Sequence, residues 1–176
     1  MEASKRLIRR LKQRGYVLLG TGCYSAVFEG KDRRQAIKIG STLSDPWLIY
    51  AEKIIGLDNP LFPRIYSLHT FEYADYYVAV TERLDCVDED DWSTDSSWMQ
   101  LSREIRDCTS TEPSVRQAGR LLNSLLKNID YARLDLHKGN IMKRENQLVL
   151  NDPLAEEEIE SSFEAWIEEN FEESCY

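Results

Sequence analysis

Hydrophobic positions recur with a helical period at the start of the chain and in short strand-like runs after it. Leu7, Ile8 and Leu11 are spaced as on one face of a helix over residues 3–14, which Gly15 would end. Three β-branched or aromatic runs follow, separated by glycines and by the charged turn GKDRR. They predict three antiparallel strands, at residues 16–19, 26–29 and 35–39.

The segment DPWLIYAEKII then predicts a helix over residues 45–55. Asp45 is placed to cap this helix, Pro46 stands at its first position, and Gly56 marks its end. Two further strands are expected at residues 64–71 and 76–82.

An acidic stretch at residues 85–95 is typical of a linker, after which the helical period returns. One helix is expected at residues 97–107, and another begins after Pro113 and carries apolar residues as far as Ile129. A short polar loop and a small hairpin over residues 141–150 follow. Strands therefore come first and helices later, which favours an α+β fold with a β-rich first portion.

The end of the chain is acidic and amphipathic. Ile159, Phe163, Ile167 and Phe171 are four residues apart and predict one apolar stripe on an acidic helix. The net charge of the chain is −9, and residues 153–176 contain nine glutamates and no lysine or arginine. The remaining 31 − 9 = 22 acidic residues balance the 22 basic ones, so the whole excess lies in this segment.

Composition narrows the setting in which we expect the protein to act. The chain has no apolar run of membrane-spanning length and does not begin like a secretory signal, so we expect a cytoplasmic protein without a membrane partner. Its four cysteines are scattered and form no close pair, which argues against a structural metal site. We also expect no direct binding of nucleic acid.

Gly20, Gly22, Ser25 and Val27 form the pattern G-x-G-x-x-S-x-V between two predicted strands. Glycines at such a turn let the main chain approach phosphate oxygens closely, so the hairpin can lie over a nucleotide. Short glycine-containing hairpins are also common structural elements, and the pattern alone leaves both interpretations open.

Lys38 stands near the end of the third predicted strand, in the sequence A-I-K. A lysine that points inward from such a strand can reach a nucleotide's phosphates, and a carboxylate on the following helix usually holds it there. Glu52 is the only acid well inside that helix and is therefore the candidate carboxylate. The simpler interpretation of Lys38 is a solvated lysine at a strand end.

Asp135 and Asn140 stand in D-x-x-x-x-N, and Asp152 follows twelve residues later after the apolar run LVL. At this spacing the first carboxylate can orient an attacking hydroxyl while the asparagine oxygen and the second carboxylate hold Mg²⁺. Each acid could also be an ordinary loop, cap or turn residue. Because glycine hairpin, strand lysine, D-x-x-x-x-N loop and final aspartate occur in the required order, together they indicate an ATP- and Mg²⁺-dependent phosphate-transfer site.

The segments LGTGCYSAVFEG, QAIKIG, LDLHKGNIM and LNDPLA resemble the protein-kinase-like fold. They are most similar to the early-expressed serine/threonine protein kinases of T-seven-like podophages, over about residues 16–155. The resemblance implies a bilobal fold with a β-rich N-lobe at residues 1–84, a hinge and linker at 85–96, and a reduced helical C-lobe at 97–176 that ends in the acidic amphipathic helix. It also implies phosphorylation of host proteins, including transcription or RNA-processing machinery, in the host bacterial cytoplasm.

The resemblance assigns roles to individual residues. Asp135 would be the catalytic base, acting with Lys38, while Asn140 and Asp152 would hold Mg²⁺. Thr81 would be the gatekeeper, and the main chain of Glu82 and Leu84 would meet adenine. The full set of implied nucleotide-binding residues is Gly20, Gly22, Ser25, Val27, Lys38, Glu52, Thr81, Glu82, Leu84 and His137.

The sequence departs from ordinary kinases on both sides of these motifs. Arg133 and Leu134 stand where His-Arg is usual, and Pro153 and Leu154 replace Phe-Gly. Only 24 residues follow Asp152, so we expect no regulation by an activation loop. Two alternatives stay open: a kinase-fold binding protein that inhibits a host factor through its acidic surface, and a small-molecule kinase of the aminoglycoside type, which the form D-L-H-x-G-N suggests.

Overall fold

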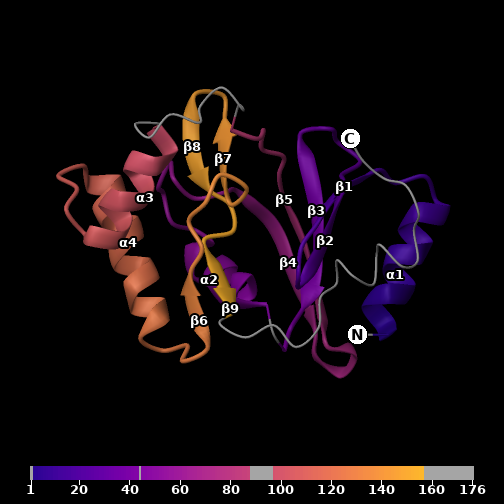
Figure 1. Ribbon diagram of the computed structural model, residues 1–176. Coiled ribbons are helices and arrows are strands. Elements are labelled where there is room, and N and C mark those ends of the chain that lie inside the picture. The colour runs from indigo at the N-terminus through magenta and orange to yellow at the C-terminus, as the bar shows by residue number, and fades with distance from the viewer. Residues whose placement is uncertain (1, 44, 88–96, 157–176) are drawn as a thin grey trace. The chain divides into compact units, whose positions relative to one another are not determined.

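The computed structural model describes residues 2–43, 45–87 and 97–156, which form a mixed α and β structure (Figure 1). The chain divides into two compact units, and each is described by itself. The first unit contains Met1–Leu48 and Arg64–Arg83, and the second contains Ile49–Pro63 and Leu84–Glu157.

The first unit is built on a five-stranded antiparallel sheet with the strand order β1-β2-β3-β5-β4. All five strands were predicted, although β1 begins two residues later than expected. Tyr16, two residues before β1, instead donates its N–H to the carbonyl of Leu11 in the preceding helix, at 3.1 Å. The strands are β1 Leu18–Thr21, β2 Ser25–Glu29, β3 Gln35–Ser41, β4 Ile65–Phe71 and β5 Tyr76–Glu82, with the short 3-10 helix η1 Glu72–Ala74 between the last two.

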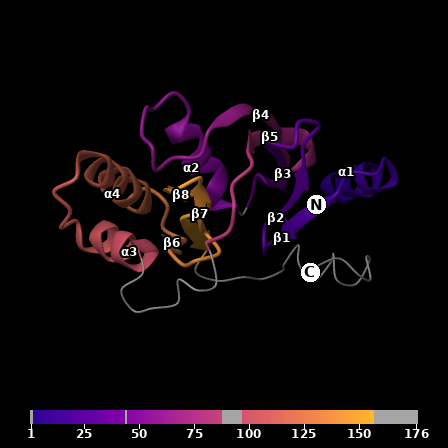
Figure 2. The same cartoon turned by 90° about the horizontal axis from the view of Figure 1, so that it is seen from above.

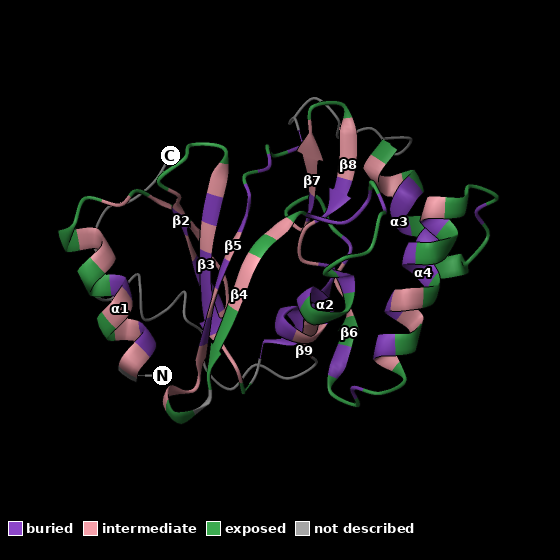
Figure 3. Ribbon diagram, turned by 180° about the vertical axis from the view of Figure 1, so that it is seen from behind, coloured by how far each residue is buried: buried purple, intermediate pink, exposed green. Residues whose placement is uncertain are grey.

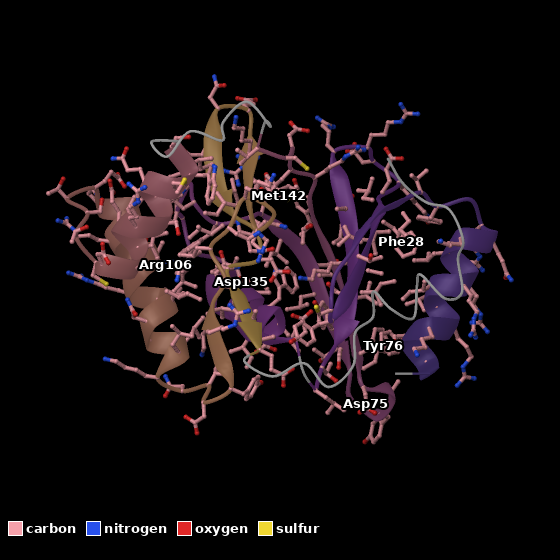
Figure 4. The ribbon with its side chains drawn as sticks, in the orientation of Figure 1. Phe28, Asp75, Tyr76, Arg106, Asp135 and Met142 are labelled. Carbon is pink, nitrogen blue, oxygen red and sulfur yellow. The ribbon has the colours of Figure 1, made fainter. Side chains whose placement is uncertain are left out.

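The N-terminal helix α1 (Glu2–Gln13) covers one face of this sheet. Ile8 is fully buried from the helix side, and Phe28 and Ile39 are fully buried from the strand side. Figure 4 shows Phe28 and Tyr76 on the side of the sheet where α1 lies. The helix ends at Gln13, and Gly15 just beyond it has a φ of 78°, a conformation that glycine adopts without strain.

The helix α2 (Pro46–Ile54) begins in the first unit and ends in the second. Asp45 caps it as predicted, because its carboxylate Oδ1 accepts the N–H of Trp47 at 3.0 Å. Gly56, with a φ of 82°, follows its end. Farther along α2, the hydroxyl of Tyr50 donates to the carbonyl of Leu150 at 2.7 Å, a contact inside the second unit.

The second unit contains the helices α3 (Ser97–Asp107) and α4 (Pro113–Leu126), which lie side by side in Figures 1 and 2. Both were predicted. Pro113 occupies the first turn of α4, and the carboxylate of Glu112 accepts the N–H of Val115 at 3.0 Å, so the helix start is capped. Figure 3 shows buried residues along one stripe of each helix, in agreement with the helical period of the apolar positions.

Two small antiparallel pairs complete the second unit. The strands β7 (Ile141–Arg144) and β8 (Gln147–Leu150) form the predicted hairpin, in which Glu145 adopts a positive φ of 56° at the turn. The strands β6 (Ala132–Leu134) and β9 (Leu154–Glu156) pair through Leu134 and Leu154 and were not predicted. Their pairing brings the residues before Asp135 next to those after Asp152.

The compact units do not coincide with the predicted ranges 1–84 and 97–176, because residues 49–63 belong with the later part of the chain. Asp85 was predicted to start the linker, yet it pairs with Lys143 through main-chain hydrogen bonds of 2.9 and 2.7 Å. Residues 88–96 of the predicted linker and the acidic helix with Ile159, Phe163, Ile167 and Phe171 lie outside the described residues. Within the described ranges, no helix combines the length and apolar character needed to cross a membrane.

Candidate functional site

A row of directly paired residues crosses the sheet of the first unit on the face opposite α1. Gly20 pairs with Val27, Val27 with Lys38, and Lys38 with Ala79. Residues paired in this way share one face, and their neighbours along each strand point to the other face. Since those neighbours include Phe28 and Ile39, which pack with α1, the glycine hairpin and Lys38 occupy the opposite face.

The glycine hairpin between β1 and β2 leaves open space above its main chain. A Cβ atom added at Gly20 or at Gly22 would meet no atom within 4 Å, and neither residue has a positive φ. The N–H of Gly22 donates to the carbonyl of Ser25 at 2.9 Å, which closes the turn. Neither packing nor backbone conformation therefore requires these two glycines, which leaves close approach of another molecule as a reason for them.

Lys38 is buried among polar and aromatic groups, with 7% of its surface exposed. Its Nζ lies 4.0 Å from Oδ2 of Asp45 and 4.3 Å from the ring centroid of Trp47. The simpler interpretation of a solvated strand-end lysine is therefore wrong. A buried ammonium needs a compensating charge, and Asp45 provides one.

The carboxylate beside Lys38 thus comes from the cap of α2. The sequence interpretation chose Glu52, which is exposed in the structure, and recognised Asp45 only as a helix cap. The two roles are compatible because a carboxylate has two oxygens: Oδ1 accepts the helix N–H while Oδ2 faces the lysine. The sequence identified Asp45 as the cap of α2, but it did not show that the second carboxylate oxygen of Asp45 would face Lys38.

The expected adenine-contacting residues lie at the end of β5 and just beyond it. Thr81 is buried and lies on the same face as Lys38, and its hydroxyl donates to the carbonyl of Glu82 at 3.2 Å. The N–H of Glu82 donates to the carbonyl of Arg64 at 2.9 Å, and its carboxylate accepts the N–H of Arg64 at 2.7 Å. Leu84 is buried in the second unit.

In the second unit, the loop after β6 carries Asp135 (Figure 4), whose main chain and carboxylate are hydrogen-bonded within the unit. The N–H of Asp135 donates to the carbonyl of Pro153 at 2.9 Å. The side-chain amide of Asn140 donates to the carbonyl of Asp135 at 3.0 Å and to its carboxylate Oδ2 at 2.9 Å. Arg133 lies beside the other carboxylate oxygen, with Nη1 3.6 Å from Oδ1. The two ends of the D-x-x-x-x-N motif are therefore in direct contact.

His137 contacts the same carboxylate from inside the loop. Its Nδ1 accepts the N–H of Gly139 at 3.0 Å, which places the proton of the neutral ring on Nε2. Nε2 lies 3.4 Å from Oδ2 of Asp135, so this proton faces the aspartate. A Cβ atom at Gly139 would lie 2.9 Å from Cε1 of His137, and the ring therefore keeps this position only because residue 139 is a glycine.

Asp152 is tied to the loop through the main chain of Asn140. The carbonyl of Asn140 accepts the N–H groups of Asn151 and Asp152, at 2.9 and 3.1 Å. Asp152 also acts on the buried Tyr50, whose pKa is raised well above its usual value, first by burial and then by the negative charge of Asp152. Three of the predicted site residues, Asp135, Asn140 and Asp152, are thus brought together.

The donor set of this loop fits Mg²⁺ in its chemistry. Because the Asn140 amide nitrogen faces a carboxylate, the remaining Asn140 atom is an oxygen, and Asp152 supplies carboxylate oxygens. Oxygen donors are the ligands that Mg²⁺ prefers, and it retains several waters beside one or two carboxylates. In the part of the chain that the structure describes, no group of three His, Cys, Asp or Glu side chains could hold a metal ion.

Comparisons with known proteins give similarity only at the level of solved structures. No protein-family model matches the chain, and no curated protein matches it. Rad53 residues 1–466 in complex with AMP-PNP is similar with a TM-score of 0.41 and 16% identity, over 84% of this chain and 42% of that one. The kinase domain of Mycobacterium tuberculosis PknI, as a double mutant, is similar with a TM-score of 0.38 and 14% identity, over 78% of this chain and 59% of that one. The chain spans less than two thirds of either neighbour.

Proposed function

We propose that the protein is an ATP-dependent protein kinase that transfers the γ-phosphoryl group to serine or threonine. The observation that carries the proposal is the hydrogen-bonded loop that joins Asp135, Asn140 and the main chain of Asp152. Phosphoryl transfer requires a carboxylate that orients the acceptor and oxygen donors that hold the metal. Here Asn140 follows Asp135 by five residues, and Asp152 follows Asn140 by twelve.

Asp135 acts on the acceptor hydroxyl. Its carboxylate is held by Asn140 and faces Nε2 of His137, so its oxygens keep a fixed orientation. The hydroxyl oxygen of the acceptor bonds to the γ-phosphorus, the bond from that phosphorus to the bridging oxygen of ADP breaks, and the hydroxyl proton passes to Asp135. General base assistance of this kind contributes about 10²- to 10⁴-fold to the rate.

The residues of the first unit bind the nucleotide in this proposal. Lys38 supplies a positive charge to the phosphates, and the main chain of the glycine hairpin approaches them because Gly20 and Gly22 carry no side chain. Mg²⁺, held by Asn140 and Asp152, would offset the negative charge of the phosphates.

The acceptor class and the cellular role extend this proposal. The likeness of the four quoted segments to phage serine/threonine kinases supports a protein acceptor in a host bacterial cytoplasm, with transcription or RNA-processing proteins as substrates. The D-L-H-x-G-N form is also compatible with a small-molecule acceptor. If the protein transferred no phosphate at all, a role as a kinase-fold binding protein would be favoured instead.

The test is transfer from γ-labelled ATP to the proteins of a bacterial lysate, followed by phosphoamino-acid analysis. We expect label on serine or threonine with wild type, and a rate at least about 10²-fold lower with Asp152→Asn. Asp130→Asn is the matched control, because Asp130 is exposed and lies outside the loop. Equal transfer by wild type and Asp152→Asn would overturn the proposal, as would label that reaches only an added aminoglycoside or no acceptor at all.

A further inference from the structure

Asp45 makes more contacts than a helix cap needs. Its carboxylate is 3% exposed at the side chain, accepts the N–H of Trp47, and lies 4.0 Å from Nζ of Lys38. It also accepts a hydrogen bond of 2.5 Å from the hydroxyl of Tyr77, which lies on β5. One carboxylate is therefore bound to the start of α2, to the sheet and to the lysine.

Tyr77 reaches Asp45 because β3 carries a glycine opposite it. Gly40 pairs with Tyr77 in the sheet, and a Cβ atom at residue 40 would lie only 2.5 and 2.6 Å from the ring carbons Cζ and Cε1. The tyrosine ring can lie over the strand only in the absence of that atom. The same ring stacks on Trp47 with a centroid distance of 5.4 Å and an interplanar angle of 18°.

The groups around Lys38 come from three different elements. Gly40 stands two residues after Lys38 on the same strand and on the same face, because side chains alternate along a strand. The lysine, the tyrosine and the carboxylate thus belong to β3, β5 and the residue that caps α2. Glu52, seven residues farther along, is exposed, so a carboxylate from within α2 is not what neutralises this buried ammonium.

We propose that Asp45 is the positioning residue that sets Lys38 for the phosphates of ATP, and that Tyr77 and Gly40 fix Asp45 from the sheet. The inference rests on the proposed function. On this proposal the sheet and the residue that caps α2 together position Lys38. The lysine therefore reaches its position without any rotation of α2.

The capping role and the positioning role can be separated by substitution. Asparagine and serine cap helices about as well as aspartate, but they carry no charge. We therefore expect Asp45→Asn and Asp45→Ser to keep α2, as measured by circular dichroism, and to lower the turnover number at saturating ATP by about 10- to 100-fold. Tyr77→Phe, which keeps both charges, should lower it by about 3- to 10-fold. Asp58→Asn, an exposed aspartate after the same helix, is the matched control.

A second readout does not depend on catalysis. The ammonium group of Lys38 can be followed by ¹H–¹⁵N spectroscopy and assigned with Lys38→Arg, and its signal should shift in Asp45→Asn and stay unchanged in Asp58→Asn. An unshifted signal, or a turnover number of Asp45→Asn equal to that of wild type, would overturn the inference. Wild type without any phosphotransfer would overturn the proposed function, and the ammonium signal would then still decide whether Asp45 holds Lys38.

Discussion

Lys38 and Asp135 are both charged residues to which we assign a role in phosphoryl transfer, but different parts of the protein hold them. Lys38 is 7% exposed and is surrounded by the side chains of Asp45 and Trp47. The side chain of Asp135 is 25% exposed, and hydrogen bonds to the main chain of Pro153 and to the amide of Asn140 fix its loop. Side-chain packing therefore positions the first charge, and a folded loop positions the second.

This difference decides how stability and activity are coupled. A buried ion pair that loses one member leaves an uncompensated charge away from water, whereas a partly exposed carboxylate is solvated whether or not it keeps its partners. We infer that changes around Lys38 affect folding and activity together, and that changes at Asp135 affect activity alone. The variants below test that separation, from the largest expected effect to the smallest.

Lys38→Met should lower the free energy of unfolding by about 3 kcal/mol, because it leaves Asp45 buried beside an apolar side chain. Urea denaturation measures the effect, and Lys53→Met on the exposed surface of α2 is the control, expected within about 0.5 kcal/mol of wild type. The double variant Lys38→Met with Asp45→Asn should regain part of the loss, since both charges are then removed. A single variant as stable as the control would show that the pair is not important for folding.

Gly40→Ala should lower the free energy of unfolding by about 1–3 kcal/mol, because the added Cβ meets the ring of Tyr77, with Cε1 only 2.6 Å away. The matched variant is Gly22→Ala, where no atom lies within 4 Å of the added Cβ. Gly22→Ala should keep its thermal midpoint and bind ATP more weakly. Equal losses of stability in the two variants would remove the distinction between a glycine required by packing and one that leaves room for a ligand.

Tyr50→Phe should lower the free energy of unfolding at neutral pH by about 1 kcal/mol, since it removes the hydrogen bond to Leu150. The pKa of Tyr50 is raised above 10.0 in the folded state, so the unfolded chain loses this proton first as the pH rises. The contribution of Tyr50 is therefore complete below about pH 10 and declines above it. Between pH 8 and 11, the free energy of unfolding should fall less steeply with pH for Tyr50→Phe than for wild type. Parallel curves for the two proteins would argue against a buried neutral phenol.

Gly139→Ala should have the smallest effect, a loss of about 2- to 5-fold in phosphotransfer without a change in thermal midpoint. The added Cβ would displace the ring of His137, which is 55% exposed at the side chain and can move into solvent. His137→Ala should show the same loss, and the two changes together should cost no more than either one. Additive losses would mean that Gly139 acts independently of the histidine.

The sequence predicted the elements with a long period or a strong end signal. The helix α3 has the predicted bounds, and α2 has the predicted cap at Asp45 and the predicted glycine after its end. The D-x-x-x-x-N motif assigned Asp135 and Asn140 to one candidate site, but it did not predict that the Asn140 amide would donate to the Asp135 carboxylate, at 2.9 Å.

The contacts that join distant residues were not predictable from the pattern. The strands β6 and β9 have three residues each and lie twenty residues apart, too short for a period-2 signal. The partner of Lys38 depends on where β5 places Tyr77 and on which way the second oxygen of Asp45 points. Register and side-chain direction decide such contacts, and a single sequence does not specify them.

The most direct test of the proposed division between binding and transfer is single-turnover phosphotransfer at saturating ATP by Asp135→Asn. The substitution keeps the size of the side chain and removes the charge that accepts the hydroxyl proton. We predict a rate at least about 10²-fold below that of wild type, with ATP bound as tightly and the unfolding midpoint unchanged. A rate equal to that of wild type would contradict the role of Asp135, and a loss of ATP binding or of folding would contradict the separation of the two regions.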